Sequence, residues 1–234
     1  MQPGNGKYLK IAHRGASHYA PENTLKAYEI ALEMGADMCE VDVHLTRDGY
    51  PVLLHDAEVG RTTDGAGRVS ELSLEEIKAL DAGAGERIPT LQEAVDVVRG
   101  RGGLYIEMKG EGCERPIVEA VRENGFAESV ILGSFHADKV RRAKSLAPEM
   151  ETALLIGLRE VDWAGLCRHI RADYAHFCWE NAPQPLSLLN ACLFQMASAN
   201  GLKVVVWHEE RPEIIREAVR LPIAGICSNR PDLL

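Results

Sequence analysis

Charged side chains stand at the ends of three apolar segments in the first half of the chain. These side chains are His13 and Arg14 after YLKIA, Glu40 and Asp42 in MCEVDV, and Glu107 and Lys109 in IEMK. Residues two apart in a β-strand point to the same face, so Glu40 would project beside Asp42. Three carboxylates that meet at one point repel each other unless a cation lies between them. Because an all-oxygen ligand set selects a hard ion, we expect Glu40, Asp42 and Glu107 to bind Mg²⁺ or Ca²⁺.

The basic and imidazole groups near this predicted metal site suit a phosphate ester. Arg14 can pair with phosphate oxygens through its planar fork, and Lys109 can pair with them as a point charge. Histidine is the usual residue for proton transfer near neutral pH, and two are available, His13 and the later His55. Together these groups indicate a phosphodiesterase. Our working assignment is His13 as base and His55 as acid, although the sequence does not decide which histidine has which role.

The order of apolar segments predicts the elements that bring these groups together. Eight strand-like segments alternate with helical patterns, which is typical of an α/β fold of the TIM type, a (β/α)8 barrel. The segments are YLKIAHRG, MCEVDV, GLYIEMK, SVILGSF, TALLIG, YAHFCW, KVVVWH and AGICSN. Helices are expected over residues 24–34, after a capping box of Thr90 and Glu93, and from near Glu114, Asp138, Asp162, Leu186 and Pro212. The chain then ends at PDLL, so the last helix would be reduced to a turn.

One segment breaks this alternation. After MCEVDV the chain continues as HLTRDGYPVLLHD, in which Asp48 and Gly49 join two apolar runs. So short a turn makes a hairpin and cannot make a parallel crossover. The hairpin would return His55 to the level of Asp42. We expect one domain over residues 1–234, with residues 44–88 as an insertion over the barrel mouth. His44 lies beyond the strand end, where a supporting role is favoured over metal ligation.

Composition narrows the classes of protein that the chain could represent. The 234 residues are 46% hydrophobic and 26% charged, as in a soluble globular protein. A formal net charge of −9 argues against nucleic acid as a partner. No segment approaches the length of a membrane span, and the first residues lack the apolar core of a signal peptide, so we expect a cytoplasmic protein. The sequence leaves the oligomeric state open.

Ordered motifs along nearly the whole chain resemble those of the glycerophosphodiester phosphodiesterases. They are His13-Arg14-Gly15, PENT from Pro21, CEVDVHLTRDG, VLLHD, Arg61-Thr62-Thr63, IPTL from Ile88, IEMK, Ser134-Phe135 and SNRPD. The resemblance implies a barrel with an insertion after the second strand, a divalent cation on Glu40, Asp42 and Glu107, and His13 and His55 as the acid/base pair. It implies hydrolysis of a glycerophosphodiester to glycerol 3-phosphate and an alcohol. Direct attack by water and a cyclic phosphate intermediate both stay open.

The segments that depart from the family pattern concern the choice of substrate. The chain has WHEE from Trp207 where the family tends to have W-T-V-N, and the stretch before Ile88 is short. We expect Phe135 and Trp207 to contact the substrate, since an aromatic face suits a cationic headgroup, although Trp207 could equally fill the core. Two alternatives remain. One is a related metal-dependent phospholipase for lysophospholipid or phosphoinositide headgroups, which the polar insertion disfavours. The other is a barrel that binds a phosphorylated ligand without turnover.

Overall fold

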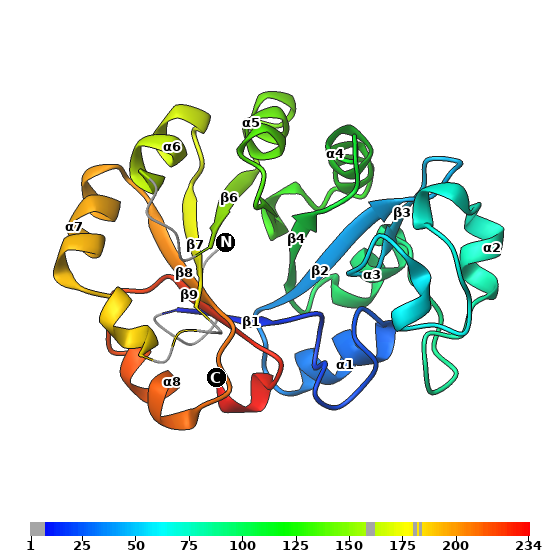
Figure 1. Ribbon diagram of the computed structural model, residues 1–234, viewed down its shortest axis with the longest axis horizontal. Helices are drawn as coiled ribbons and strands as arrows, with labels where there is room; N and C mark the ends of the chain where they lie inside the picture. Colours follow the sequence, from blue (N-terminus) through cyan, green and yellow to red (C-terminus); the bar gives the residue numbers. More distant parts are fainter. Residues whose placement is uncertain (1–7, 158–161, 180–181, 183) are drawn as a thin grey trace.

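Parallel strands close into a barrel at the centre of the molecule, and the helices surround them (Figure 1). The computed structural model describes residues 8–157, 162–179, 182 and 184–234. The parallel strands are β1 (Leu9–Ala12), β2 (Met38–Leu45), β4 (Gly103–Met108), β5 (Val130–Ser134), β6 (Glu151–Ile156), β7 (Tyr174–Cys178), β8 (Lys203–Trp207) and β9 (Gly225–Ser228). Because β1 pairs with both β2 and β9, the sheet closes on itself. The predicted TIM-type barrel is therefore confirmed.

The remaining strand, β3 (Pro51–Leu53), pairs with β2 in the antiparallel sense, as the short turn predicted. Gly49 in that turn has φ +89°, a conformation that glycine adopts without strain. The backbone N–H of Leu54 donates to the carbonyl of Asp42 at 3.0 Å. His55 follows directly, so the hairpin carries this side chain back beside β2. The position of the whole segment 44–88 over the barrel mouth stays a prediction.

The chain after β3 forms short elements before it rejoins the barrel. They are η1 (Val59–Arg61), η2 (Val69–Glu71) and α2 (Leu74–Ala79), and their apolar side chains form a small core of their own. The helix α2 was not expected, although Ser73 and Glu76 form a reciprocal capping box at its start. Six residues are too few for a clear helical period, which explains why the sequence pattern did not predict it.

The helices that cover the barrel follow the predicted order. They are α1 (Leu25–Glu33), α3 (Leu91–Val98), α4 (Glu114–Glu123), α5 (Ala137–Leu146), α6 (Trp163–Ile170), α7 (Ala191–Ala199) and α8 (Pro212–Ala218). The capping box of Thr90 and Glu93 is present. The helix expected near Leu186 begins later, because a 3₁₀ turn, η4 (Pro185–Leu188), comes first and Asn190 caps α7. The chain ends in a single turn, η5 (Pro231–Leu233), as expected for a reduced last helix.

Apolar layers inside and outside the strands hold the barrel rigid. Side chains such as Ile11, Tyr105 and Val205 fill its interior, and two larger clusters pack the strands against the helices. Strand ends therefore have little freedom to move apart. None of the helices in the described parts of the chain has the length and apolar character of a membrane span.

Gly15, directly after His13 and Arg14, packs against α1 too closely for any side chain. It has φ +78°, and an added Cβ would lie 2.7 Å from both the carbonyl carbon and the Cβ of Ala27. Gly15→Ala should cost about 1–2 kcal/mol for the left-handed backbone and a further 1–3 kcal/mol for the overlap. Gly35→Ala is the matched control, because Gly35 has φ +85° but nothing within 4 Å. Free energies of unfolding from chemical denaturation would test this, and equal losses would contradict the packing argument.

Candidate active site

Three buried carboxyl groups lie together, two of them inside β2 and the third near the carboxyl end of β4. Asp42 and Glu107 are register partners in neighbouring parallel strands, and Glu40 lies on the same face of β2. One oxygen from each lies within 4.8 Å of the others. Glu40 Oε1 and Glu107 Oε2 have no hydrogen-bond partner among the described residues. Because buried carboxylate oxygens without partners are costly, these residues fit a metal ion, and the cluster could hold one.

The carboxyl groups of this cluster differ in charge. Burial, together with repulsion from Asp42, raises the pKa of Glu40 well above its ordinary value and the pKa of Glu107 to about 7. Burial alone would also raise the pKa of Asp42, but Lys109 and Arg14 more than offset it and lower that pKa. Without a bound cation, Asp42 is therefore the most acidic of the three. A cation would stabilise the ionised forms of the other two.

Two basic side chains approach Asp42 from different strands. Lys109 follows β4, and its Nζ lies 3.4 Å from Asp42 Oδ1 and 3.0 Å from Glu107 Oε1. Arg14 follows β1, and its Nε lies 3.3 Å from Asp42 Oδ2. The backbone N–H of Arg14 donates to Glu40 Oε2 at 2.9 Å, and the backbone of Arg14 is left-handed, with φ 55°. The positively charged side chains of Arg14 and Lys109 also line a pocket, where they can bind an anionic ligand.

Asn23 orients Asp42, a role that the sequence did not reveal. Its side-chain N–H donates to Asp42 Oδ2 at 2.9 Å, and its carbonyl oxygen accepts from the backbone N–H of Asp42 at 3.2 Å. The hydroxyl of Tyr28 donates to the same carbonyl oxygen. Asn23 lies in the PENT motif, just before the start of α1. Thr24 is the residue that caps α1.

His13 is buried beside Glu40, with its two ring nitrogens in different surroundings. Nε2 lies 3.9 Å from Glu40 Oε2, and Nδ1 lies 2.7 Å from the side-chain oxygen of Asn229, to which it can donate. Burial, assisted by the charge of Arg14, lowers the pKa of His13 to about 3. The ring is therefore neutral at physiological pH and keeps a free lone pair on Nε2. His208, from the WHEE segment that differs from the family pattern, stacks on the ring of His13 with centroids 4.9 Å apart.

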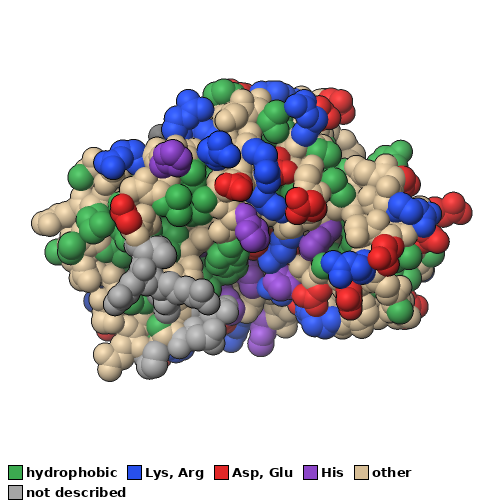
Figure 2. Space-filling model, turned by 45° about the horizontal axis from the view of Figure 1, so that its top comes forward, with side chains coloured by type: hydrophobic (Ala, Val, Ile, Leu, Met, Phe, Trp, Pro, Cys, Tyr) green, Lys and Arg blue, Asp and Glu red, His purple; other side chains and the backbone are tan. Residues whose placement is uncertain are grey.

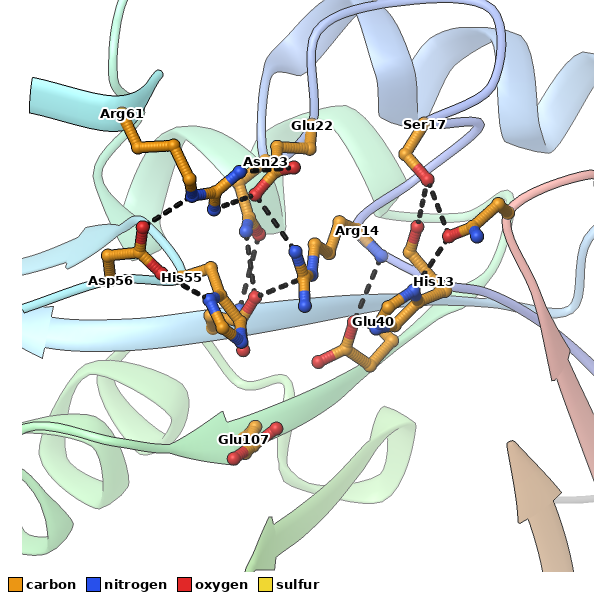
Figure 3. A network of polar contacts seen from close by, with 12 residues as sticks. His13, Arg14, Ser17, Glu22, Asn23, Glu40, His55, Asp56, Arg61 and Glu107 are labelled. Carbon is orange, nitrogen blue, oxygen red and sulfur yellow. Dashed lines mark hydrogen bonds and ion pairs between the residues drawn. The ribbon is translucent and has the colours of Figure 1, made fainter. Parts of the chain in front are cut away.

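His55 reaches the site from the hairpin and is oriented by an acidic neighbour. Its Nδ1 lies 2.6 Å from Asp56 Oδ1, and Arg61 holds the other oxygen of Asp56. The bond from Arg61, followed by that from His55, lowers the pKa of Asp56 to about 2. His44 lies within β2, so the expectation that it follows the strand end was wrong. It does not join the carboxyl cluster, and its Nε2 contacts the carbonyl of His55 at 3.2 Å. In Figure 3 the two imidazoles, His13 and His55, lie on either side of Arg14.

A pocket of about 580 Å³ opens over these groups, and histidine and basic side chains gather at the centre of that face (Figure 2). Among the predicted site residues it is lined by His13, Arg14, His55, Lys109, Phe135 and Trp207. Phe135 is 41% exposed, whereas Trp207 is 7% exposed, and their rings meet edge to face with centroids 5.5 Å apart. Other residues of the lining that sequence reasoning did not assign are Ser17, His18, Glu22, Cys178, His208 and Asn229. The structure thus brings the predicted site residues to one place.

Sequence comparison connects the chain with phosphodiesterases. The sequence model of the Glycerophosphoryl diester phosphodiesterase family matches residues 13–233. A glycerophosphodiester phosphodiesterase of Caldanaerobacter subterraneus is 37% identical over 97% of this chain and 96% of its own length. A putative glycerophosphodiester phosphodiesterase of Bacillus subtilis is 34% identical over 96% of this chain and 95% of its own length.

Solved structures agree with the sequence comparison. A phosphodiesterase of Oleispira antarctica, solved in complex with the product sn-glycerol-3-phosphate, is 30% identical. It has a TM-score of 0.85 and covers 95% of this chain and 93% of its own. A glycerophosphodiester phosphodiesterase of Agrobacterium tumefaciens is 28% identical, with a TM-score of 0.81 and coverage of 97% and 98%. By both sequence and fold, the chain belongs to the Glycerophosphoryl diester phosphodiesterase family.

Proposed function

We propose that this protein hydrolyses glycerophosphodiesters to glycerol 3-phosphate and an alcohol, with a divalent cation held by Glu40, Asp42 and Glu107. The observation that carries the proposal is the buried carboxyl cluster, with partnerless oxygens, beside two basic residues and two histidines in one pocket. Relatives named as glycerophosphodiester phosphodiesterases, and one neighbour solved with sn-glycerol-3-phosphate, support the choice of substrate. All-oxygen ligands favour Mg²⁺ or Ca²⁺.

The side chains around the pocket have distinct proposed roles. The cation, when bound, would supply positive charge to the phosphate oxygens. Arg14 and Lys109 would bind the same phosphate group. Neutral His13 would accept a proton at Nε2 from the nucleophile, which is either water or the free hydroxyl of the glycerol. His55, as an imidazolium whose Nδ1 proton faces Asp56, would donate its second proton from Nε2 to the leaving alkoxide.

The outer part of the pocket would receive the alcohol. Phe135 presents an exposed aromatic surface there, and Trp207 backs it. Such a wall suits an apolar or cationic headgroup such as choline. We further propose that residues 44–88 form an insertion over the mouth of a single barrel domain, because this segment supplies His55 to the lining of the pocket.

Removing either histidine should reduce turnover while the fold remains. General acid–base catalysis contributes about 10² to 10⁴-fold, so His13→Ala and His55→Ala should each lower kcat for glycerophosphocholine by that order. His169→Ala is the control, since His169 is exposed on α6. A substrate with an activated leaving group should rescue the acid variant, His55→Ala, more than His13→Ala. Turnover equal to that of the His169 control in either variant would contradict the assignment.

Glu107→Gln tests whether Glu107 binds the metal ion. Mg²⁺ or Ca²⁺ at a hundredfold excess over its dissociation constant should stabilise the wild type by about 3 kcal/mol, and the variant should lose activity and most of this gain. Glu111→Gln is the control, because Glu111 is exposed just after β4. Thermal melts with and without the ion measure the stability gain of each protein. A full gain in Glu107→Gln would show that Glu107 is not a ligand.

The same variant has a predicted pH dependence without metal. The pKa of Glu107 is raised from 4.5 to about 7, so between these values the folded state holds a proton that the unfolded state has lost. Metal-free wild type should therefore lose stability as pH rises through this interval, and Glu107→Gln should lose less. Denaturant unfolding at several pH values in EDTA is the measurement. Parallel stability curves for the two proteins would refute a raised pKa at Glu107.

A further inference from the structure

Arg61 joins two parts of the site that come from different regions of the sequence. It ends η1, and its side chain is 46% exposed. Its Nε donates to Asp56, while Nη1 and Nη2 donate to the two oxygens of Glu22 at 3.1 and 2.7 Å. Figure 3 shows the guanidinium between these two carboxylates. A planar guanidinium can hold two partners at fixed angles, which a lysine cannot do.

On the first side, Arg61 acts on His55 through Asp56. Asp56 accepts from Arg61 with one oxygen and lies against His55 Nδ1 with the other, 2.6 Å away. With one oxygen held by Arg61, the carboxylate cannot turn away from the imidazole. A fixed acceptor at Nδ1 holds the ring orientation and stabilises the imidazolium, whose second proton, on Nε2, faces the pocket.

On the second side, Arg61 acts on Arg14 through Glu22. Glu22 Oε1 accepts from Arg14 Nη1 at 3.0 Å and from Arg61 Nη2 at 2.7 Å. A carboxylate bound to Arg14 alone would neutralise the charge that Arg14 offers to a phosphate. With Arg61 present, the two arginines balance Glu22 and Asp56. Without it, the group would carry one net negative charge beside a pocket that must receive an anion.

We propose that Arg61 is a positioning residue that holds His55 through Asp56 and keeps Arg14 available to phosphate through Glu22. The inference rests on the proposed function, because it assumes that a phosphate diester reacts in this pocket. The segment after β3 would then contribute Arg61 as well as His55, and Arg61 would connect this segment to the loop after β1 through Glu22. Arg61 itself need not touch the substrate.

Arg68→Gln provides a matched control for Arg61→Gln. Arg68 lies in the same segment, is 54% exposed in its side chain and pairs with Glu58 at 3.9 Å, so its loss changes the net charge equally. Arg61→Gln should weaken the binding of glycerol 3-phosphate about tenfold and lower kcat for glycerophosphocholine about tenfold, as expected when charge-assisted hydrogen bonds are lost. Arg68→Gln should change neither value, and both variants should melt at similar temperatures.

The double variant Glu22→Gln/Arg61→Gln separates the effect of Arg61 on Arg14 from its effect on His55. It restores the charge balance around Arg14, so the affinity for glycerol 3-phosphate should recover. Asp56 still lacks its hydrogen bond from Arg61, so kcat should stay low. Calorimetric titration with glycerol 3-phosphate and a turnover assay give the two values. Equal behaviour of Arg61→Gln and Arg68→Gln in both measurements would overturn the proposal, and full recovery of kcat in the double variant would overturn the His55 side.

A third readout keeps the test independent of the reaction. Nitrogen-15 spectra of the neutral form of His55 should show the proton on Nδ1 in the wild type and in Arg68→Gln, but a mixture of tautomers in Arg61→Gln. If the wild type releases no glycerol 3-phosphate from glycerophosphocholine, the proposed function fails, while affinity and tautomer still test Arg61. An unchanged tautomer in Arg61→Gln would overturn the His55 side whatever the activity.

Discussion

Carboxylates that are buried close together repel each other unless their charge is neutralised. Three such groups, Glu40, Asp42 and Glu107, lie together in this barrel. Parallel pairing places Asp42 beside Glu107, and the alternation of a strand places Glu40 on the same face. Their ligand atoms lie within 4.8 Å of one another. Burial, and then repulsion from Asp42, keep the pKa of Glu40 and Glu107 high in the absence of a cation. Several neighbouring side chains compensate this charge.

The groups that neutralise this charge follow the ends of β1 and β4. The turn after β1 provides Arg14 and Asn23, the end of β4 provides Lys109, and all three contact Asp42. These residues also resolve an apparent conflict, since a chain with a net charge of −9 must bind a phosphate anion. The positive charge is local, and it is concentrated where the pocket opens. Net charge governs approach from a distance, whereas paired side chains within the site govern binding.

The meeting of the three carboxyl groups could be predicted because their positions follow from regular geometry. A period of two and the common end of parallel strands are enough to bring Glu40, Asp42 and Glu107 together. The partners of the histidines could not be predicted in this way. Asn229 meets His13 from 216 residues away, and Arg61 meets Glu22 across two irregular loops. Such contacts depend on the paths of loops, which leave no periodic signal in the sequence, as the short helix α2 also shows.

The central claim is that one cation lies among the three carboxyl groups. Anomalous diffraction from crystals soaked in Mn²⁺, another hard ion, would test it most directly. The account predicts a peak about 2.0 to 2.6 Å from an oxygen of each of Glu40, Asp42 and Glu107, with Lys109 Nζ outside that coordination shell. A peak elsewhere, or none while Lys109 keeps its contacts with Asp42 and Glu107, would contradict it.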